Sequence, residues 1–353
     1  MIIGITYDLR KDYLSQGFGK EETAEFDRIE TVNAIDDALR SLGFKTVRIG
    51  CMMNLLARLN AGERWDLVFN IAEGIYGAGR ESQVPALLDA FHIPYTFSDP
   101  VVLGLSLNKG LTKRVVRDLG VPTPDFYVVE NIEDIKNVNI SFPLFAKPIA
   151  EGTSKGINSF SFINDETTLE AVCSNLLERF VQPVIVEEFL PGREFTVGIL
   201  GTGPSARTIG VLEVILLEKA EGNAYSYLNK SNYWGKVDYR LADDKEARLA
   251  SEMALKVWRG LGCRDGGRMD FRCDAKGMPN FIEVNPLAGL DPELSDLIIL
   301  ARKKGIEYKE LISLIVASAL ERVKSTPQVQ PPAFTLPLSH TANPINVPLQ
   351  MQV

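Results

Sequence analysis

Histidine is scarce in this sequence, and its scarcity limits the chemistry that the protein can perform. Only His92 and His340 occur in 353 residues, so we do not expect a histidine base or a histidine-rich metal site. We expect His92 to be a surface residue at the end of a helix. The four cysteines lie far apart, form no CxxC pair and follow no secretory signal. We therefore expect reduced thiols in a cytoplasmic protein.

Long apolar runs and an excess of positive charge are also missing. No apolar run approaches the roughly 20 residues that cross a bilayer, so we expect no membrane partner. The net charge of −8 argues against a general nucleic-acid binder, which needs a basic surface. The remaining composition, 45% hydrophobic and 24% charged, is typical of a soluble globular protein. The length predicts two or three domains.

The N-terminal part of the chain alternates strand patterns with helix patterns, which indicates an α/β unit with a parallel sheet. Apolar residues at helical spacing between residues 29 and 42 predict a helix that ends at Gly43. Short apolar runs predict three strands, at residues 2–7, 46–50 and 66–74. The last of these strands leads into Asn70, Glu73 and the loop 74–81. Ligands gather at such strand ends in open α/β sheets, although a solvated connection explains these residues equally well.

The rest of the chain predicts further strand-rich domains and a tail. Residues 219–240 are rich in Tyr, Asn, Ser and Gly and predict a long loop that closes like a lid. Helical patterns occupy residues 244–261 and 306–323. Residues from 324 onward are rich in Pro, Gln and Thr without periodicity and predict a disordered tail. The domain boundaries predicted in this way give the segments 1–105, 106–186, 187–323 and 324–353.

The segment from Arg268 to Asn285 predicts a β-hairpin with one polar face. Two alternating runs flank a turn at residues 274–277. Because side chains alternate along a strand, Arg268 and Asp270 share a face, and Glu283 and Asn285 share a face with Ile282 and Val284 behind them. An arginine and three oxygen donors then converge, and such oxygens are ligands that Mg²⁺ takes when it also binds phosphates. A hairpin with a wet face and a salt bridge is the alternative.

Two further segments have the composition of nucleotide-binding elements. The loop EGTSKG at residues 151–156 is small, polar and flanked by glycine, so its N–H groups can surround phosphate oxygens. It lacks the spacing of a Walker A loop, and an ordinary hairpin turn is the alternative. Residues 187–190 form a strand end that is placed to face an adenine, or else an edge strand with solvated carboxylates.

Seven segments in order resemble the ATP-grasp ligases, and within them the D-alanine–D-alanine ligase group. The resemblance runs from about Trp65 to Val323 and rests on LVFNIAEGIYG, VPALLDAFHIPYTFSD, LNKGLTKRVV, FAKPIAEGTSKG, VEEFLPGREFTVGIL, GRMDFR and FIEVNPLAG. It implies a three-domain ATP-grasp fold of the α/β class, with α+β character in the ATP-grasp part. An N-terminal parallel α/β substrate domain (1–105) would precede a central (106–186) and a C-terminal (187–323) ATP-grasp subdomain, with ATP between two antiparallel sheets.

The resemblance also implies an activity. ATP would phosphorylate a carboxylate, an amine would attack the acyl phosphate, and ADP and phosphate would leave, so that an amide, peptide or imine-type C–N bond forms. ATP and Mg²⁺, with Mn²⁺ as an alternative, would be required. The partners would be small molecules or amino acids, and a homodimer is a family-level expectation. Lysines and metal would neutralise the spreading charge, and a lid would exclude water.

Residue roles carried over from the family are as follows. The phosphates would be contacted by Lys109, Lys147 and, from the lid, Lys230, with Thr153 and Ser154 closing on the γ-phosphate. The nucleoside would be held by Glu187, the backbone between Glu188 and Leu190, and Glu194. The metal would be held by Asp270, Glu283 and Asn285. The tetrahedral intermediate would be steadied by Arg268 and the backbone near Gly289.

The amino-acid half of the sequence departs from the family pattern. The acid that binds the first substrate's amino group has three candidates, Glu25, Asp27 and Glu30. The family's histidine segment contains Glu73 and Arg80 here, and the tyrosine of the lid is Ser231. The serine that binds the second substrate's carboxylate corresponds to Leu294, with Ser295 beside it.

These departures predict substrates other than two D-alanines. One alternative is a ligase that joins an amino acid to a mycosporine precursor, and another is a true D-alanine–D-alanine ligase. A non-catalytic ATP-binding module and a structural protein are the alternatives from other classes.

Overall fold

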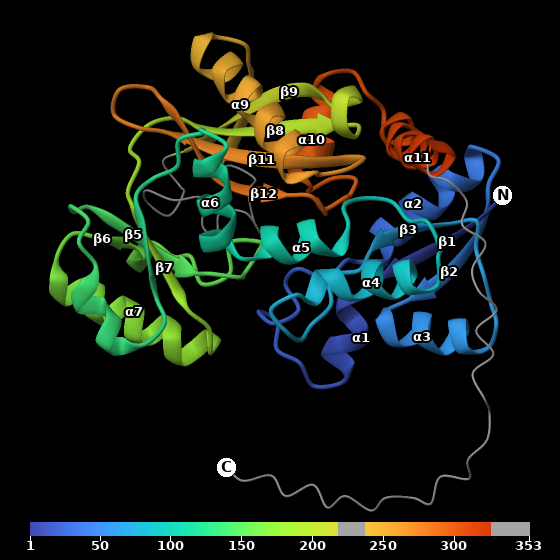
Figure 1. The fold of residues 1–353 in the computed structure, drawn as a ribbon, viewed down its shortest axis with the longest axis horizontal. Helices are drawn as coiled ribbons and strands as arrows, with labels where there is room; N and C mark the ends of the chain where they lie inside the picture. The colour runs from blue at the N-terminus through green and yellow to red at the C-terminus, as the bar shows by residue number, and fades with distance from the viewer. Residues whose placement is uncertain (218–236, 326–353) are drawn as a thin grey trace, which may run out of the picture.

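The computed structural model describes residues 1–217 and 237–325 and contains three sheets with helices around them (Figure 1). Residues 218–236 and 326–353 lie outside the described residues, and they include residues 219–236 of the predicted lid and all but the first two residues of the predicted tail. The remainder of the predicted lid is not a loop, because Val237–Ala242 forms strand β10.

The N-terminal domain contains a parallel sheet of order β2-β1-β3, as predicted. Alternate residues of its strands point to opposite faces. Phe69 packs with α2 on one face, and Val68 packs with α3 and α4 on the other. The elements are β1 (Ile2–Tyr7), α1 (Arg10–Ser15), α2 (Ile29–Ser41), β2 (Lys45–Gly50), α3 (Met52–Asn60), β3 (Leu67–Ile71) and α4 (Gln83–Ala90). The sequence patterns did not predict α1 or α3.

Two helices join this domain to a four-stranded antiparallel sheet of order β4-β7-β5-β6 (Figure 1). Helix α7 covers the sheet because Leu169, Cys173 and Leu176 lie on one helical face. Asp165 begins this helix by accepting the N–H of Thr168. The elements are α5 (Pro100–Leu107), α6 (Lys109–Asp118), β4 (Phe126–Val129), β5 (Leu144–Pro148), β6 (Phe162–Ile163), α7 (Glu166–Phe180) and β7 (Val184–Glu188).

The C-terminal part contains a five-stranded antiparallel sheet of order β10-β9-β8-β11-β12. Helix α9 packs its alanines, Val257 and Trp258 against one face, and α10 lies against β8 and β9. The elements are β8 (Glu194–Leu200), β9 (Arg207–Leu216), β10 (Val237–Ala242), α9 (Lys245–Leu261), β11 (Gly266–Cys273), β12 (Pro279–Asn285), α10 (Asp296–Lys303) and α11 (Tyr308–Ser325).

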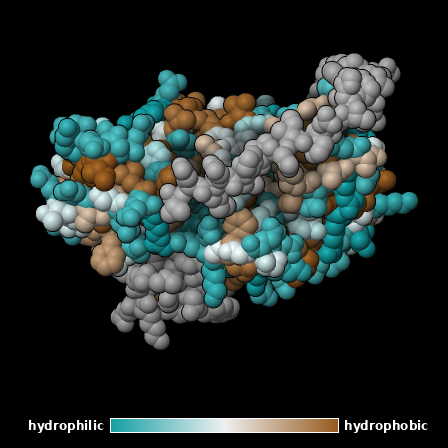
Figure 2. All heavy atoms as spheres, turned by 90° about the horizontal axis from the view of Figure 1, so that it is seen from below, coloured by the Kyte–Doolittle hydropathy of each residue, from teal (hydrophilic) through white to brown (hydrophobic). Residues whose placement is uncertain are grey.

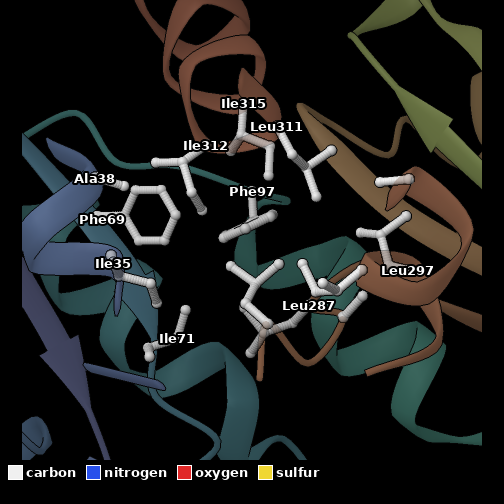
Figure 3. Close-up of a cluster of buried hydrophobic side chains, with 14 of the residues drawn as sticks. Ile35, Ala38, Phe69, Ile71, Phe97, Leu287, Leu297, Leu311, Ile312 and Ile315 are labelled. Carbon is white, nitrogen blue, oxygen red and sulfur yellow. The ribbon is translucent and has the colours of Figure 1, made fainter. Parts of the chain in front are cut away.

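A shared hydrophobic core joins the N-terminal domain to the C-terminal part. Phe69 from β3 and Ile35 from α2 lie close to Ile312 of α11 in one cluster, and Phe97 and Leu287 belong to the same cluster (Figure 3). This packing places the carboxyl ends of the parallel strands beside the segment that follows β12. The predicted domain boundaries at 105/106 and 186/187 stay predictions, and α5 and β7 continue across them.

The surface in Figure 2 shows hydrophobic residues in separate small groups among hydrophilic ones. Among the described residues, none of the helices combines the length and the apolarity needed to cross a bilayer.

Candidate active site

The predicted hairpin exists, and its polar face is the centre of the site. In the register of β11 and β12, Arg268 pairs with Asn285 and Asp270 pairs with Glu283. Met269 and Val284 are buried behind them, as predicted. The prediction for Ile282 was wrong, because a bulge shifts the register after Asp270 and places Ile282 on the cavity wall together with Glu283.

The oxygen donors of this face converge on a small volume. Asn285 Nδ2 lies 3.4 Å from Asp270 Oδ2 and 3.4 Å from Glu283 Oε1. Thr196 on β8 donates to Asp270 Oδ1 at 2.8 Å, and Arg268 forms an ion pair with Asp270. Arg268 Nε also lies 3.8 Å from Asp296, which accepts the hydroxyl of Tyr239.

Two carboxylates and an amide oxygen, which Asn285 presents to them when its amide group turns over, form a donor set that fits a hard divalent cation such as Mg²⁺. The set needs its amide donor, because within residues 1–217 and 237–325 no three His, Cys, Asp or Glu side chains lie close enough together to hold a metal ion.

A cavity of about 110 Å³ lies between the four-stranded and five-stranded sheets. Its apolar wall is suited to a flat ring, and its polar wall combines carboxylates with three lysines. The apolar wall includes Phe145, Ile157, Phe189, Leu190 and Ile282. The predicted nucleotide residues Lys109, Lys147, Thr153, Ser154, Glu187, Glu188, Leu190 and Glu194 all line this cavity. Lys230 lies outside the described residues.

The carboxylate of Glu187 is buried between two lysines. Lys113 Nζ lies 2.9 Å from Glu187 Oε1, and Lys147 Nζ lies 2.9 Å from Oε2. Burial alone would raise the pKa of Glu187, but the two ammonium groups hold it below its usual value. Burial lowers the pKa of Lys113 to about 8 although Glu187 acts against this. Sequence reasoning missed Lys113, although the spacing from Lys109 places both on one face of α6.

Lys109 connects the metal face with the 151–156 loop. Its Nζ donates to the carbonyl of Glu151 at 2.6 Å and lies 3.4 Å from Glu283 Oε2. In that loop Thr153 and Ser154 adopt positive φ angles of 49° and 57°. This conformation is uncommon outside glycine and turns successive backbone groups in new directions. The N–H of Lys155 donates to the carbonyl of Gly152 at 2.9 Å, so residues 152–155 form a tight turn with two left-handed residues at its centre.

A second cavity, of about 300 Å³, continues from the first toward the N-terminal domain. The two cavities share wall residues, namely Lys109, Glu151, Thr153, Arg268, Glu283 and Asp296. Of the residues predicted to contact substrate, Glu25, Asp27, Glu73, Gly289, Leu294 and Ser295 line the second cavity. Ser231 lies outside the described residues. Glu30 is exposed, and neither Glu30 nor Arg80 lines the cavity.

Arg80 instead belongs to a buried ion cluster that ties the N-terminal domain to the 151–156 loop. Its guanidinium lies 3.0 Å from Glu25, and Lys155 lies 3.2 Å from the same carboxylate and pairs with Glu151. Glu25 also accepts the N–H of Gly152 at 2.5 Å. Burial would raise the pKa of Glu25, but Arg80 and Lys155 lower it below its usual value. Glu25 is therefore occupied by internal partners.

Three other carboxylates of the second cavity have no ion pair among the described residues. Burial raises the pKa of Glu81 to about 7 and, with Asp291 nearby, the pKa of Asp27 to about 7. Burial, followed by repulsion from Glu81, raises the pKa of Glu73 well above its usual value. Gly74, with φ of +70°, lies against the backbone of Arg80, which brings the two ends of the loop together. Glu73 and Glu81 therefore lie side by side.

Comparison with known proteins identifies the family of this chain. Residues 115–317 match the family model described as the D-ala D-ala ligase C-terminus. A D-alanine–D-alanine ligase of Aquifex aeolicus is 34% identical over 290 residues, 82% of this chain and 94% of that protein. The chain belongs to the D-alanine–D-alanine ligase family. It is thus an ATP-dependent, ADP-forming C–N ligase of the ATP-grasp fold, and such ligases use ATP with a divalent metal and act on small molecules.

Other relatives of this ligase have different names, and two solved structures have a similar fold. An uncharacterized protein, y4sG, of Sinorhizobium fredii is 31% identical over 72% of this chain and 75% of that protein. The crystal structure of a Bacillus anthracis D-alanine–D-alanine ligase complexed with ATP has a TM-score of 0.70 and 21% identity, covering 92% of this chain and 99% of that chain. The VanG D-Ala:D-Ser ligase of Enterococcus faecalis has a TM-score of 0.68 and 17% identity, covering 90% and 99%.

Proposed function

We propose that this ligase uses ATP and Mg²⁺ to join an amino-acid carboxylate to an amine, with a substrate pair other than two D-alanines. The observation that carries the proposal is the wall shared by the two cavities. Lys109, Arg268 and Glu283 line both the cavity between the two sheets and the second cavity, so a γ-phosphate in the first and a substrate carboxylate in the second would meet there.

The side chains at this wall suit transfer of a phosphoryl group to a carboxylate. Asp270, Glu283 and Asn285 would hold Mg²⁺, for which Mn²⁺ would substitute, and the metal would neutralise phosphate charge. Arg268 would bind the substrate carboxylate and then the oxyanion that forms when the amine attacks the acyl phosphate. The amine loses its proton, phosphate leaves, and the amide remains. The backbone around Thr153 and Ser154 would bind the γ-phosphate.

The carboxyl groups of the second cavity support an amine-bearing substrate, because an ammonium group beside them would lower the raised pKa values of Glu73 and Glu81 and favour their charged forms. Arg28 is paired with Asp291 at 2.5 Å, and Glu25 is occupied by Arg80 and Lys155. Asp27, Glu73 and Glu81 remain as the carboxylates with no ion pair in the described ranges. We infer that the substrate's amino group binds at Glu73 and Glu81, where the family pattern has its histidine segment, and that Leu294 replaces a serine contact to the second substrate.

Release of ADP and phosphate tests the proposal. Wild-type protein is assayed with Mg-ATP and pairs of neutral, basic and acidic amino acids, each as the L and the D enantiomer. The Glu283→Gln variant is the negative control. We expect turnover with pairs that contain a free amino group, and little with acidic amino acids because the cavity is acidic. Turnover with D-alanine alone would favour the true D-alanine–D-alanine ligase. No turnover with any amino-acid pair, or with an amino acid and a mycosporine precursor, would contradict the proposal.

Assembly as a homodimer is part of the proposal on family grounds alone. Sedimentation of the full chain measures it directly, and a monomer at micromolar concentration would contradict it.

A further inference from the structure

Lys113 is a completely buried ammonium group that the proposed reaction does not use. Its exposed fraction is 0%. Besides Glu187, it donates to Thr123 Oγ1 at 2.9 Å and to the carbonyl of Phe281 at 3.2 Å. A buried ammonium is unfavourable unless every proton has a partner, and here three partners surround it. Lys113 is therefore fixed behind the nucleotide cavity and does not line it.

Lys147 shares Glu187 with Lys113 but differs in position. It lines the nucleotide cavity, where the proposed phosphates bind. Its partner among the described residues is the carboxylate of Glu187, 2.9 Å away. Binding of phosphate by Lys147 thus requires that its ammonium group turns away from Glu187. Without a second cation, that turn would leave a buried carboxylate unpaired, which is strongly unfavourable.

We propose that Lys113 is a positioning residue that serves as the permanent counter-ion of Glu187 and so allows Lys147 to leave Glu187 for the phosphates of the nucleotide. Two cations share one carboxylate, so one cation is available to a second anion. The contacts to Thr123 and Phe281 keep Lys113 in place on α6 while Lys147 moves. This inference rests on the proposed nucleotide site.

The position of Lys113 also links the two halves of that site. Glu187 lies on β7 of the four-stranded sheet, and Phe281 precedes the bulge and Glu283 on β12 of the five-stranded sheet. One ammonium group therefore contacts both sheets. Loss of its charge has a specific consequence, because Glu187 would then retain Lys147 as its remaining counter-ion and the phosphates would lose theirs.

Calorimetric affinities for adenosine and ADP, measured in the presence of Mg²⁺, test the inference. For Lys113→Met we expect ADP affinity to fall about tenfold, equivalent to about 1.4 kcal/mol, with adenosine affinity unchanged within about threefold. Lys113→Arg is the matched control and should retain the wild-type ratio because it keeps the charge. Equal losses for both ligands would show a merely structural role, and unchanged affinities for both ligands would show no role; either result overturns the inference.

The double variant Lys113→Met/Glu187→Gln covers the case in which the single variant does not fold. It contains no buried unpaired charge, and the neutral amide releases Lys147, so we expect the wild-type ratio of ADP to adenosine affinity. A tenfold lower ratio in the double variant would overturn the inference. Absence of ADP binding by the wild-type protein would instead contradict the proposed function, so the two failures are distinguishable.

Discussion

Asp270 and Glu283 lie directly opposite each other on β11 and β12, in the last pair before the bulge. Like charges at such positions destabilise a sheet by roughly 0.2–1 kcal/mol. Arg268 pairs with Asp270, and Lys109 lies 3.4 Å from Glu283. The bulge adds Ile282 to the wall of the cavity between the two sheets, on the same side. The hairpin therefore holds two carboxylates together at the expense of stability, which is the arrangement expected for a metal-binding strand pair.

Replacing Glu283 should reduce catalytic activity without reducing the stability of the fold. Glu283→Gln should lower turnover at least about 100-fold, since a metal ligand and its charge are lost. The melting temperature should stay within about 2 °C, because removal of the like-charge pair with Asp270 offsets the loss of the ion pair with Lys109. ADP release and thermal unfolding measure the two effects. Glu310→Gln, an exposed glutamate on α11, is the control. Wild-type turnover in Glu283→Gln would exclude Glu283 from the site.

The buried cluster around Glu25 should be important for stability. Glu25→Ala leaves Arg80 and Lys155, which are 8% and 7% exposed, with fewer anionic partners. We expect a loss of about 3 kcal/mol in the free energy of unfolding, measured with urea. Glu21→Ala is the matched control, because Glu21 pairs with Arg179 at the surface and should cost less than about 1 kcal/mol. Equal losses in the two variants would contradict the role of the cluster.

The raised pKa of Glu81 predicts a pH dependence of stability. Its pKa rises from 4.5 to about 7 through burial, so the folded protein favours the protonated form. The stability that the folded protein gains from the protonated Glu81 is fully present below pH 4.5, and it is lost as the pH rises to about 7. Glu81→Gln should therefore lose less stability than wild type between pH 5 and pH 8, by on the order of 1 kcal/mol. Parallel curves of unfolding free energy against pH would contradict this.

Local sequence patterns predicted much of the fold and of the metal face. The alternation of polar and apolar residues around Arg268 and Asn285 gave the hairpin and its polar face. The bulge at Ile282 was missed because periodicity of two contains no signal for an extra residue. Helix α5 was missed although Asp99 and Pro100 are a cap and a first-turn residue, since the uniformly apolar segment that follows has no helical period.

Contacts between segments that lie far apart in the chain could not be predicted from the sequence patterns. Glu25 was a candidate for binding substrate, but Arg80 and Lys155 occupy it, and their approach depends on packing of the N-terminal domain against the 151–156 loop. Lys113 was missed for the same reason, because its partner Glu187 lies 74 residues away on another element. Residue type and spacing indicate which side chains are able to bind a ligand; tertiary structure decides which remain available.

The affinity of ADP with saturating Mg²⁺ and with a chelator, measured for wild type and Glu283→Gln, tests the metal site most directly and requires no knowledge of the substrates. The account predicts that Mg²⁺ increases ADP affinity at least about tenfold in wild type and less than about twofold in Glu283→Gln. Equal ADP affinities with and without Mg²⁺ in the wild-type protein, or an undiminished effect of Mg²⁺ in the variant, would contradict it.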